Sequence, residues 1–115
     1  KGNIIRNNSV LGICPGCGGG IYCWYSSPLI CNNTIMENEA WEGGGISYSG
    51  SNPTIKDNVI IKNLGWNGGG LSICQDSSMI ENNLIAQNYA HYVGGGIALN
   101  NHSKVLIKGN IISEN

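Results

Sequence analysis

The chain has 115 residues and a nearly balanced charge, with 6 Lys and Arg against 7 Asp and Glu and a net charge of −1. This balance leaves no basic stripe for nucleic acid, and no apolar run approaches the roughly 20 residues of a transmembrane helix. Only 11% of the residues are charged, while 18 residues are glycine. Such a composition suits an extracellular or cell-surface protein, and we expect that location.

The N-terminal residues begin a repeat that continues to the end of the chain. Asn3, Ile5 and Asn8 form a partial first copy. Four Gly-Gly-Gly triplets follow at intervals of 25, 25 and 26 residues, beginning at Gly18, Gly43, Gly68 and Gly94. A fixed period of this length indicates one supersecondary unit stacked on copies of itself.

Each copy has the same order after its glycines. Two apolar positions spaced by two residues come first, which is the alternation of a β-strand. A turn rich in Ser, Asn and Pro follows, then an apolar position, an asparagine, a second apolar position and a second asparagine. The apolar columns are Ile21, Ile46, Leu71 and Ile97; Cys23, Tyr48, Ile73 and Leu99; Ile30, Ile55, Ile80 and Ile107; and Ile35, Ile60, Ile85 and Ile112. The asparagine columns are Asn33, Asn58, Asn83 and Asn110, and Asn38, Asn63, Asn88 and Asn115.

The spacing of the apolar residues argues against helical repeats, since no window keeps the i, i+3, i+4, i+7 pattern for more than a turn. We therefore predict an all-β fold, a right-handed parallel β-helix of four to five coils, with three short strands per coil and a turn back to the glycines. The coils are expected near residues 3–32, 33–57, 58–82 and 83–109, with a partial coil at 110–115. Because no polar capping unit is evident, we expect residues 1–115 to be a single segment of a longer solenoid.

The corner residues have physical reasons for their places. Asparagine tolerates left-handed backbone and can hydrogen-bond the asparagine one coil away, so the two asparagine columns are expected to form ladders at the corners. Glycine suits a corner where φ is positive or where a side chain would collide with the next coil. Stacking at roughly 4.8 Å per coil would pair the backbone groups and align the isoleucine columns.

The pattern Ser-x-Pro-x-Ile-x-x-Asn-x-Ile-x-x-Asn-x-Ala-x-x-Gly-Gly-Gly-Ile is clearest between Ser51 and Ile97. It resembles the right-handed parallel β-helix repeats of the pectate-lyase-like superfamily. In particular it is similar to repeats of bacterial surface and secreted proteins related to polymorphic outer-membrane proteins, with Ile-x-x-Asn in place of their Phe-x-x-Asn. The resemblance implies the fold. It implies no single activity, because the superfamily includes lyases, hydrolases, adhesins and passive stalks.

Cys14 and Cys17 form a C-x-x-C motif in an enlarged loop between Asn8 and Gly18. In redox proteins such a pair sits at the N-terminus of a helix, and the sequence predicts no helix here. We therefore expect a structural disulfide between Cys14 and Cys17, or free thiols, rather than metal binding or catalysis. Two of the other cysteines, Cys23 and Cys31, fit the role of small buried hydrophobic residues.

Three aromatic residues, Trp41, Trp66 and Tyr92, each precede a glycine triplet by two residues. Stacked along one edge of the solenoid, they could form a platform that contacts sugar rings, and they are the candidate carbohydrate contacts. They could equally pack on one another and shield the corner, which we favour. His91 and Tyr89 border this edge.

No metal site, cofactor or catalytic centre is predicted within the segment. Related hydrolases use two or three aspartates on neighbouring coils as acid and base. The only aspartates here, Asp57 and Asp76, occupy different positions of the repeat. We therefore expect no active site among these residues.

These observations predict a structural or adhesive scaffold of a secreted or cell-surface repeat protein. One alternative is a carbohydrate-binding or carbohydrate-processing β-helix whose active site lies outside this segment. Another is an extracellular filament subunit that stacks on itself. The expected partners are neighbouring coils of the same or identical chains, and polysaccharide.

Overall fold

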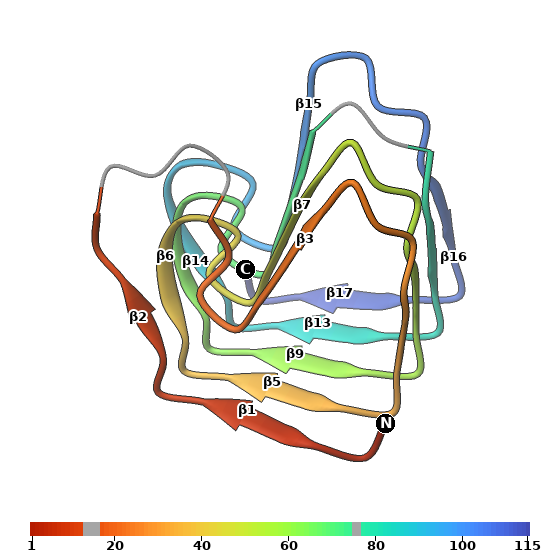
Figure 1. The fold of residues 1–115 in the computed structure, drawn as a ribbon. Coiled ribbons are helices and arrows are strands. Elements are labelled where there is room, and N and C mark those ends of the chain that lie inside the picture. The colour runs from red at the N-terminus through yellow and green to blue at the C-terminus, as the bar shows by residue number, and fades with distance from the viewer. Residues whose placement is uncertain (13–16, 75–76) are drawn as a thin grey trace.

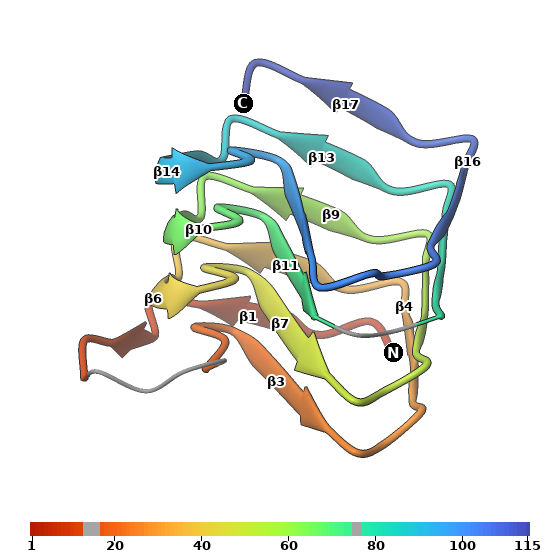
Figure 2. The same cartoon turned by 90° about the horizontal axis from the view of Figure 1, so that it is seen from above.

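The computed structural model describes residues 1–12, 17–74 and 77–115. In these residues the only regular elements are β-strands, which wind into stacked coils (Figure 1). Four parallel sheets run along the stack, and each complete coil contributes one strand to each sheet. Seen from above, successive coils step along the axis from the N-terminus to the C-terminus (Figure 2). The predicted parallel β-helix is confirmed.

The strands are grouped here by sheet, in the order in which the chain visits the four sheets. The first sheet consists of β1 (Ile4–Arg6), β5 (Thr34–Met36), β9 (Val59–Ile61), β13 (Leu84–Ala86) and β17 (Ile111–Ser113). The second sheet consists of β2 (Ser9–Val10), β6 (Glu39–Glu42), β10 (Leu64–Asn67) and β14 (Tyr89–Val93). The third sheet consists of β3 (Ile21–Trp24), β7 (Ile46–Ser49), β11 (Leu71–Cys74) and β15 (Ile97–Asn100). The fourth sheet consists of β4 (Leu29–Cys31), β8 (Thr54–Lys56), β12 (Met79–Glu81) and β16 (Leu106–Lys108).

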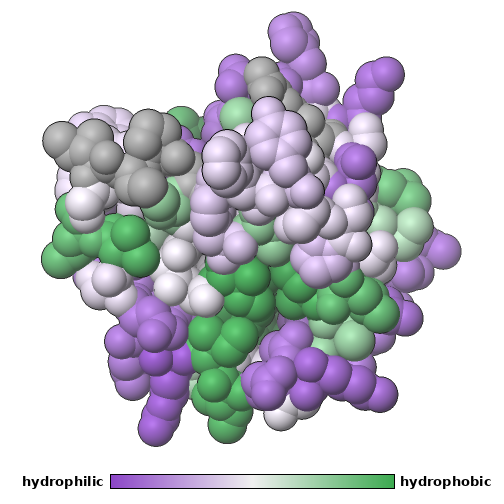
Figure 3. Space-filling view, in the orientation of Figure 1, coloured by the Kyte–Doolittle hydropathy of each residue, from purple (hydrophilic) through white to green (hydrophobic). Residues whose placement is uncertain are grey.

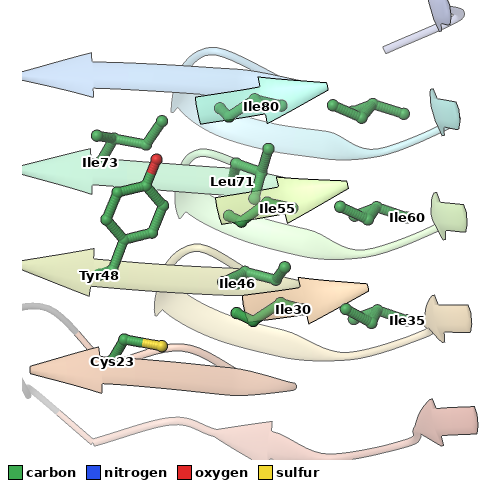
Figure 4. Close-up of a cluster of buried hydrophobic side chains, with 11 residues drawn as sticks. Cys23, Ile30, Ile35, Ile46, Tyr48, Ile55, Ile60, Leu71, Ile73 and Ile80 are labelled. Carbon is green, nitrogen blue, oxygen red and sulfur yellow. The ribbon is translucent and has the colours of Figure 1, made fainter. Parts of the chain in front are cut away.

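The core is made of like residues stacked on like residues. Ile35 pairs with Ile60 and Ile60 with Ile85, and all three are fully buried. The third and fourth sheets complete the cluster from the other sides (Figure 4). Burying one such side chain is worth about 1.5–3 kcal/mol. The four apolar columns of the sequence therefore become one continuous core.

A tyrosine hydroxyl is buried in this core. Tyr48 occupies the column of Cys23 and Ile73 and is fully buried. Its hydroxyl lies 2.6 Å from the hydroxyl of Ser78, which belongs to the turn before β12. Because a buried hydroxyl without a partner is costly, this bond explains how a tyrosine fits among isoleucines.

Each coil has four strands rather than the three predicted, and the additional strand is that of the second sheet. The prediction made residues 39–42 part of a turn back to the glycines, but they form β6. The inward positions of this sheet carry Ala40 and Gly65. Because these positions carry no large apolar residue, the strand lacks the alternation of apolar and polar residues by which strands are predicted from a sequence.

The glycine triplets fold back against the second sheet, so that no side chain fits between them. A Cβ atom on Gly69 would lie 2.5 Å from the carbonyl oxygen of Gly95 and would also overlap the carbonyl oxygen of Tyr89. The first glycine of the triplet, Gly68, has a φ of +68°, which side chains rarely adopt. Both reasons expected for glycine therefore apply in the triplet: a positive φ at its first position and the lack of space for a side chain at its second.

The asparagine columns form two ladders. In the first, the backbone N–H of Asn33 donates to Oδ1 of Asn58 at 2.9 Å, and that of Asn58 donates to Oδ1 of Asn83 at 2.9 Å. The side-chain amide of Asn58 donates to Oδ1 of Asn83 at 3.0 Å and to the carbonyl oxygen of Ile30 at 2.9 Å. One buried asparagine therefore joins three coils. In the second ladder, Asn38, Asn63 and Asn88 repeat this arrangement.

The left-handed backbone is displaced from its expected place by one residue. Positive φ occurs at the exposed residue before each ladder asparagine, for example Asn32 (54°), Asp57 (56°) and Lys62 (55°), and not at the ladder asparagines. The ladder side chain must point inward to reach the next coil, so the turn is made by the residue before it. The ladder asparagines therefore do not use their tolerance for left-handed backbone, although they form the expected hydrogen bonds between coils.

We predict that Gly69→Ala lowers the free energy of unfolding by about 3 kcal/mol or more, because its Cβ would overlap two backbone carbonyls that cannot move independently of their coils. Gly12→Ala is the matched control, since nothing lies within 4 Å of the added Cβ. Chemical denaturation of both variants measures the difference. Equal stability of the two variants would contradict the close packing of the triplet.

Candidate functional site

The candidate carbohydrate contacts lie on the outer face of the second sheet. Side chains alternate along each strand, so the positions of Ala40 and Gly65 face inward, whereas Trp41 and Trp66 lie outside. Trp41 is 39% exposed. These tryptophans therefore belong to a strand surface and not, as the sequence suggests, to a turn.

Trp41 and Trp66 stack on each other. Their ring centroids are 4.7 Å apart and their planes differ by 10°. This distance matches the roughly 4.8 Å between neighbouring strands, so the rings lie face to face with one ring per coil. Aromatic pairs of this kind contribute about 0.5–1.5 kcal/mol beyond their burial.

The third predicted member, Tyr92, is not next in the stack. Gly65 pairs with Ala90 but Asn67 pairs with Val93, so a bulge places two residues opposite Trp66. The ring of His91 lies 4.3 Å from that of Trp66, while the ring of Tyr92 lies 6.2 Å away. Spacing in the sequence could not reveal this, because the bulge shifts the register by one residue.

A groove of about 180 Å³ opens beside the stack, towards the N-terminal coil. We call it the aromatic groove; its lining residues are Val10, Leu11, Glu39, Ala40, Trp41, Leu64 and Trp66. Figure 3 looks onto the N-terminal end of the stack and shows apolar surface at its left margin, over β2. Glu39 is the one charged residue of the lining, and its carboxylate forms no ion pair with the described residues.

A second group of exposed aromatic side chains lies on the third sheet and was missed in the sequence. Tyr22 and Trp24 occupy the outward positions of β3 and are 41% and 66% exposed. Tyr25 follows, with its ring 5.4 Å from that of Trp24. The sequence does contain a signal for them: Tyr22 and Trp24 alternate with the inward residues Ile21 and Cys23, which predicts that their side chains point outward.

The cysteines divide into two classes. Cys17 is disulfide-bonded; Cys14 lies outside the described residues, so the predicted pair stays a prediction. Cys23 and Cys31 are free and buried, and Cys74 is free and partly exposed. Burial raises the pKa of the Cys23 thiol, which disfavours the reactive thiolate at neutral pH.

The charged residues are dispersed. Asp57 is exposed at a corner, and Asp76 lies outside the described residues. Lys108 and Glu81, which occupy one column, approach to 3.9 Å on the surface. Across residues 1–12, 17–74 and 77–115, no three His, Cys, Asp or Glu side chains are grouped as metal ligands. Within the same residues, no helix could span a membrane.

Comparison with known proteins identifies a family. The family described as a right-handed beta helix region matches residues 1–115, the whole chain. Neither the curated proteins nor the solved structures contain a significant match. The family agrees with the predicted resemblance and with the four parallel sheets of the structure.

We predict that an alkylating reagent labels Cys74 before Cys23 and Cys31 in the native protein, because the side chain of Cys74 is partly exposed while the other two are buried. Raised pKa and burial should keep Cys23 unlabelled at pH 7 until the protein unfolds. Peptide mass spectrometry before and after denaturation measures the order. Native labelling of Cys23 as fast as Cys74 would contradict the inward orientation of its column.

Proposed function

The chain belongs to the right-handed β-helix family, and we propose that it serves as a structural or adhesive scaffold in a secreted or cell-surface repeat protein. The observation that carries this proposal is the continuity of the two asparagine ladders through every coil. Each coil is held by the next through the same bonds, which suits a rigid spacer whose length is set by the number of coils.

The disulfide of Cys17 supports the proposed location. Disulfides persist in oxidising environments such as the cell exterior. The low content of charged residues, 11%, also suits a protein outside the cell. The free cysteines are compatible with this location where they are buried, as Cys23 and Cys31 are.

A scaffold of this kind should tolerate an additional coil. We expect a variant with residues 33–57 duplicated in tandem to fold and to be longer by about 4.8 Å along its axis, since each coil adds one strand spacing. Distances between fluorophores placed on the first and last coils measure the change. Loss of folding, or an unchanged distance, would contradict the scaffold.

Enzymatic turnover would also contradict it. The unmodified chain should release no sugar products from a panel of plant and bacterial polysaccharides, because the scaffold role needs no chemistry. Product release by this chain would contradict both the scaffold and the expectation that no active site lies among these residues.

A filament subunit is a second candidate, and the direction of the ladders favours it. The backbone N–H groups of the ladder asparagines donate to the coil on their C-terminal side, as Asn8 donates to Asn38 and Asn88 to Asn115. A filament would continue these bonds from one chain to the next, and sedimentation would detect the end-to-end assemblies; a strictly monomeric profile would remove this candidate.

A further inference from the structure

Among the described residues, Trp66 is the aromatic neighbour of Trp41, and no other aromatic ring contacts Trp41. Trp66 covers one face of the ring at 4.7 Å. The strand on the N-terminal side is β2, in which Val10 pairs with Ala40. The residue after Val10 is Leu11, whose side chain is 74% exposed. Leu11 lines the aromatic groove together with Trp41, and its largely exposed side chain leaves the groove open at this side.

The chemistry of the groove is that of a small-ligand site with one polar group. Six of its seven lining residues are apolar, and the seventh, Glu39, places a carboxylate on the same outer face of β6 as Trp41. Binding sites of this kind combine an apolar surface with a few polar atoms that orient the ligand. The volume of about 180 Å³ is well below the 300–1,000 Å³ of sites for drug-sized molecules. The groove therefore fits one small ring.

A pyranose ring satisfies these requirements together. One face of the ring presents C–H groups, which are attracted to the negative face of an aromatic ring. Its edge carries hydroxyl groups, which can donate hydrogen bonds to the Glu39 carboxylate. An apolar side chain from another protein would fill the groove but would leave that carboxylate without a hydrogen-bond donor, and covering an unpaired carboxylate is costly.

We propose that the aromatic groove binds a neutral pyranose unit of a glycan, with Trp41 as the stacking surface and Glu39 as the hydroxyl acceptor. This inference rests on the proposed adhesive role of the scaffold and names its ligand class. Among the residues that the structure describes, the lining of the groove carries the Glu39 carboxylate and no Lys or Arg side chain, so uronic acid polymers are repelled and neutral glycans are selected.

Binding extends from the groove along the second sheet towards its C-terminal end. There the bulge of β14 presents Tyr92, which is 73% exposed, and His91 next to Trp66. A chain of several sugars would contact these side chains only after the first ring occupies the groove. Longer oligosaccharides therefore bind more tightly than single sugars.

The test is calorimetric titration of the chain with neutral hexasaccharides of glucose, xylose, mannose and N-acetylglucosamine, and with a hexamer of galacturonic acid. We expect at least one neutral hexasaccharide to bind, and the acidic hexamer to bind more weakly than it does. Trp41→Ala should weaken the binding by about tenfold or more, since a stacked ring contributes about 1.4 kcal/mol. Glu39→Ala should weaken it by roughly fivefold through loss of a hydrogen bond.

Two control variants separate the groove from general effects. Trp24→Ala removes an exposed tryptophan of the third sheet and should leave the binding unchanged. Trp41→Tyr keeps a flat ring and should retain most of the affinity. Circular dichroism of each variant verifies that it is folded, which is expected because Trp41 lies on the outer face of the sheet.

Several results would overturn the inference. They are the absence of binding to every neutral hexasaccharide, an equal loss of binding in Trp24→Ala and Trp41→Ala, or tighter binding of the acidic hexamer. Self-association that Trp41→Ala abolishes, without any sugar binding, would assign the groove to a protein contact. None of these results affects the tandem-coil experiment, so the failure of the glycan site and the failure of the scaffold are distinguishable.

Discussion

The structure depends on how the backbone N–H and carbonyl groups at the corners of the coils find hydrogen-bond partners. Along each strand, N–H and carbonyl groups pair with the neighbouring coils, but at the corner the N–H of Asn58 donates to a side chain, Oδ1 of Asn83. The amide of Asn58 in turn reaches back to the carbonyl of Ile30. An unpaired buried group of this kind costs about 1–3 kcal/mol. Asparagine therefore holds the coils in register, and the isoleucine columns stack because of it.

The glycine triplets hold the second sheet at the same spacing as the coils, and so determine the spacing of the side chains on its outer surface. Because they pack directly against the backbone of the second sheet, as Gly69 does against Tyr89, that sheet has no thick core of its own. Its strands follow the coil spacing, and its large side chains are on the outside. The stack of Trp41 on Trp66 at 4.7 Å is a consequence. The proposed glycan site is thus built by the same repeat that builds the scaffold.

The period of the sequence was enough to predict the columns, because Ile35, Ile60 and Ile85 recur at positions that must meet when coils stack. It was not enough to predict the second sheet, whose inward positions are too small to leave an apolar signal. The tolerance of asparagine for left-handed backbone does not reveal which corner residue adopts it, and Lys62 and its equivalents adopt it under the constraint of the stack. The groove depends on the exposure of Leu11, and the position of His91 depends on a bulge. The spacing of residues in the repeat predicts neither feature.

Native-state hydrogen exchange tests the role of the ladders most directly. The backbone N–H groups of Asn58 and Asn83, bonded to side chains of the next coil at 2.9 and 2.8 Å, should exchange as slowly as those of the core residue Ile60. The N–H of Ser77 also donates to an asparagine, Asn52, but on the exposed surface, and should exchange much faster. If Asn58 and Asn83 exchange as fast as Ser77, the ladders do not hold the coils together.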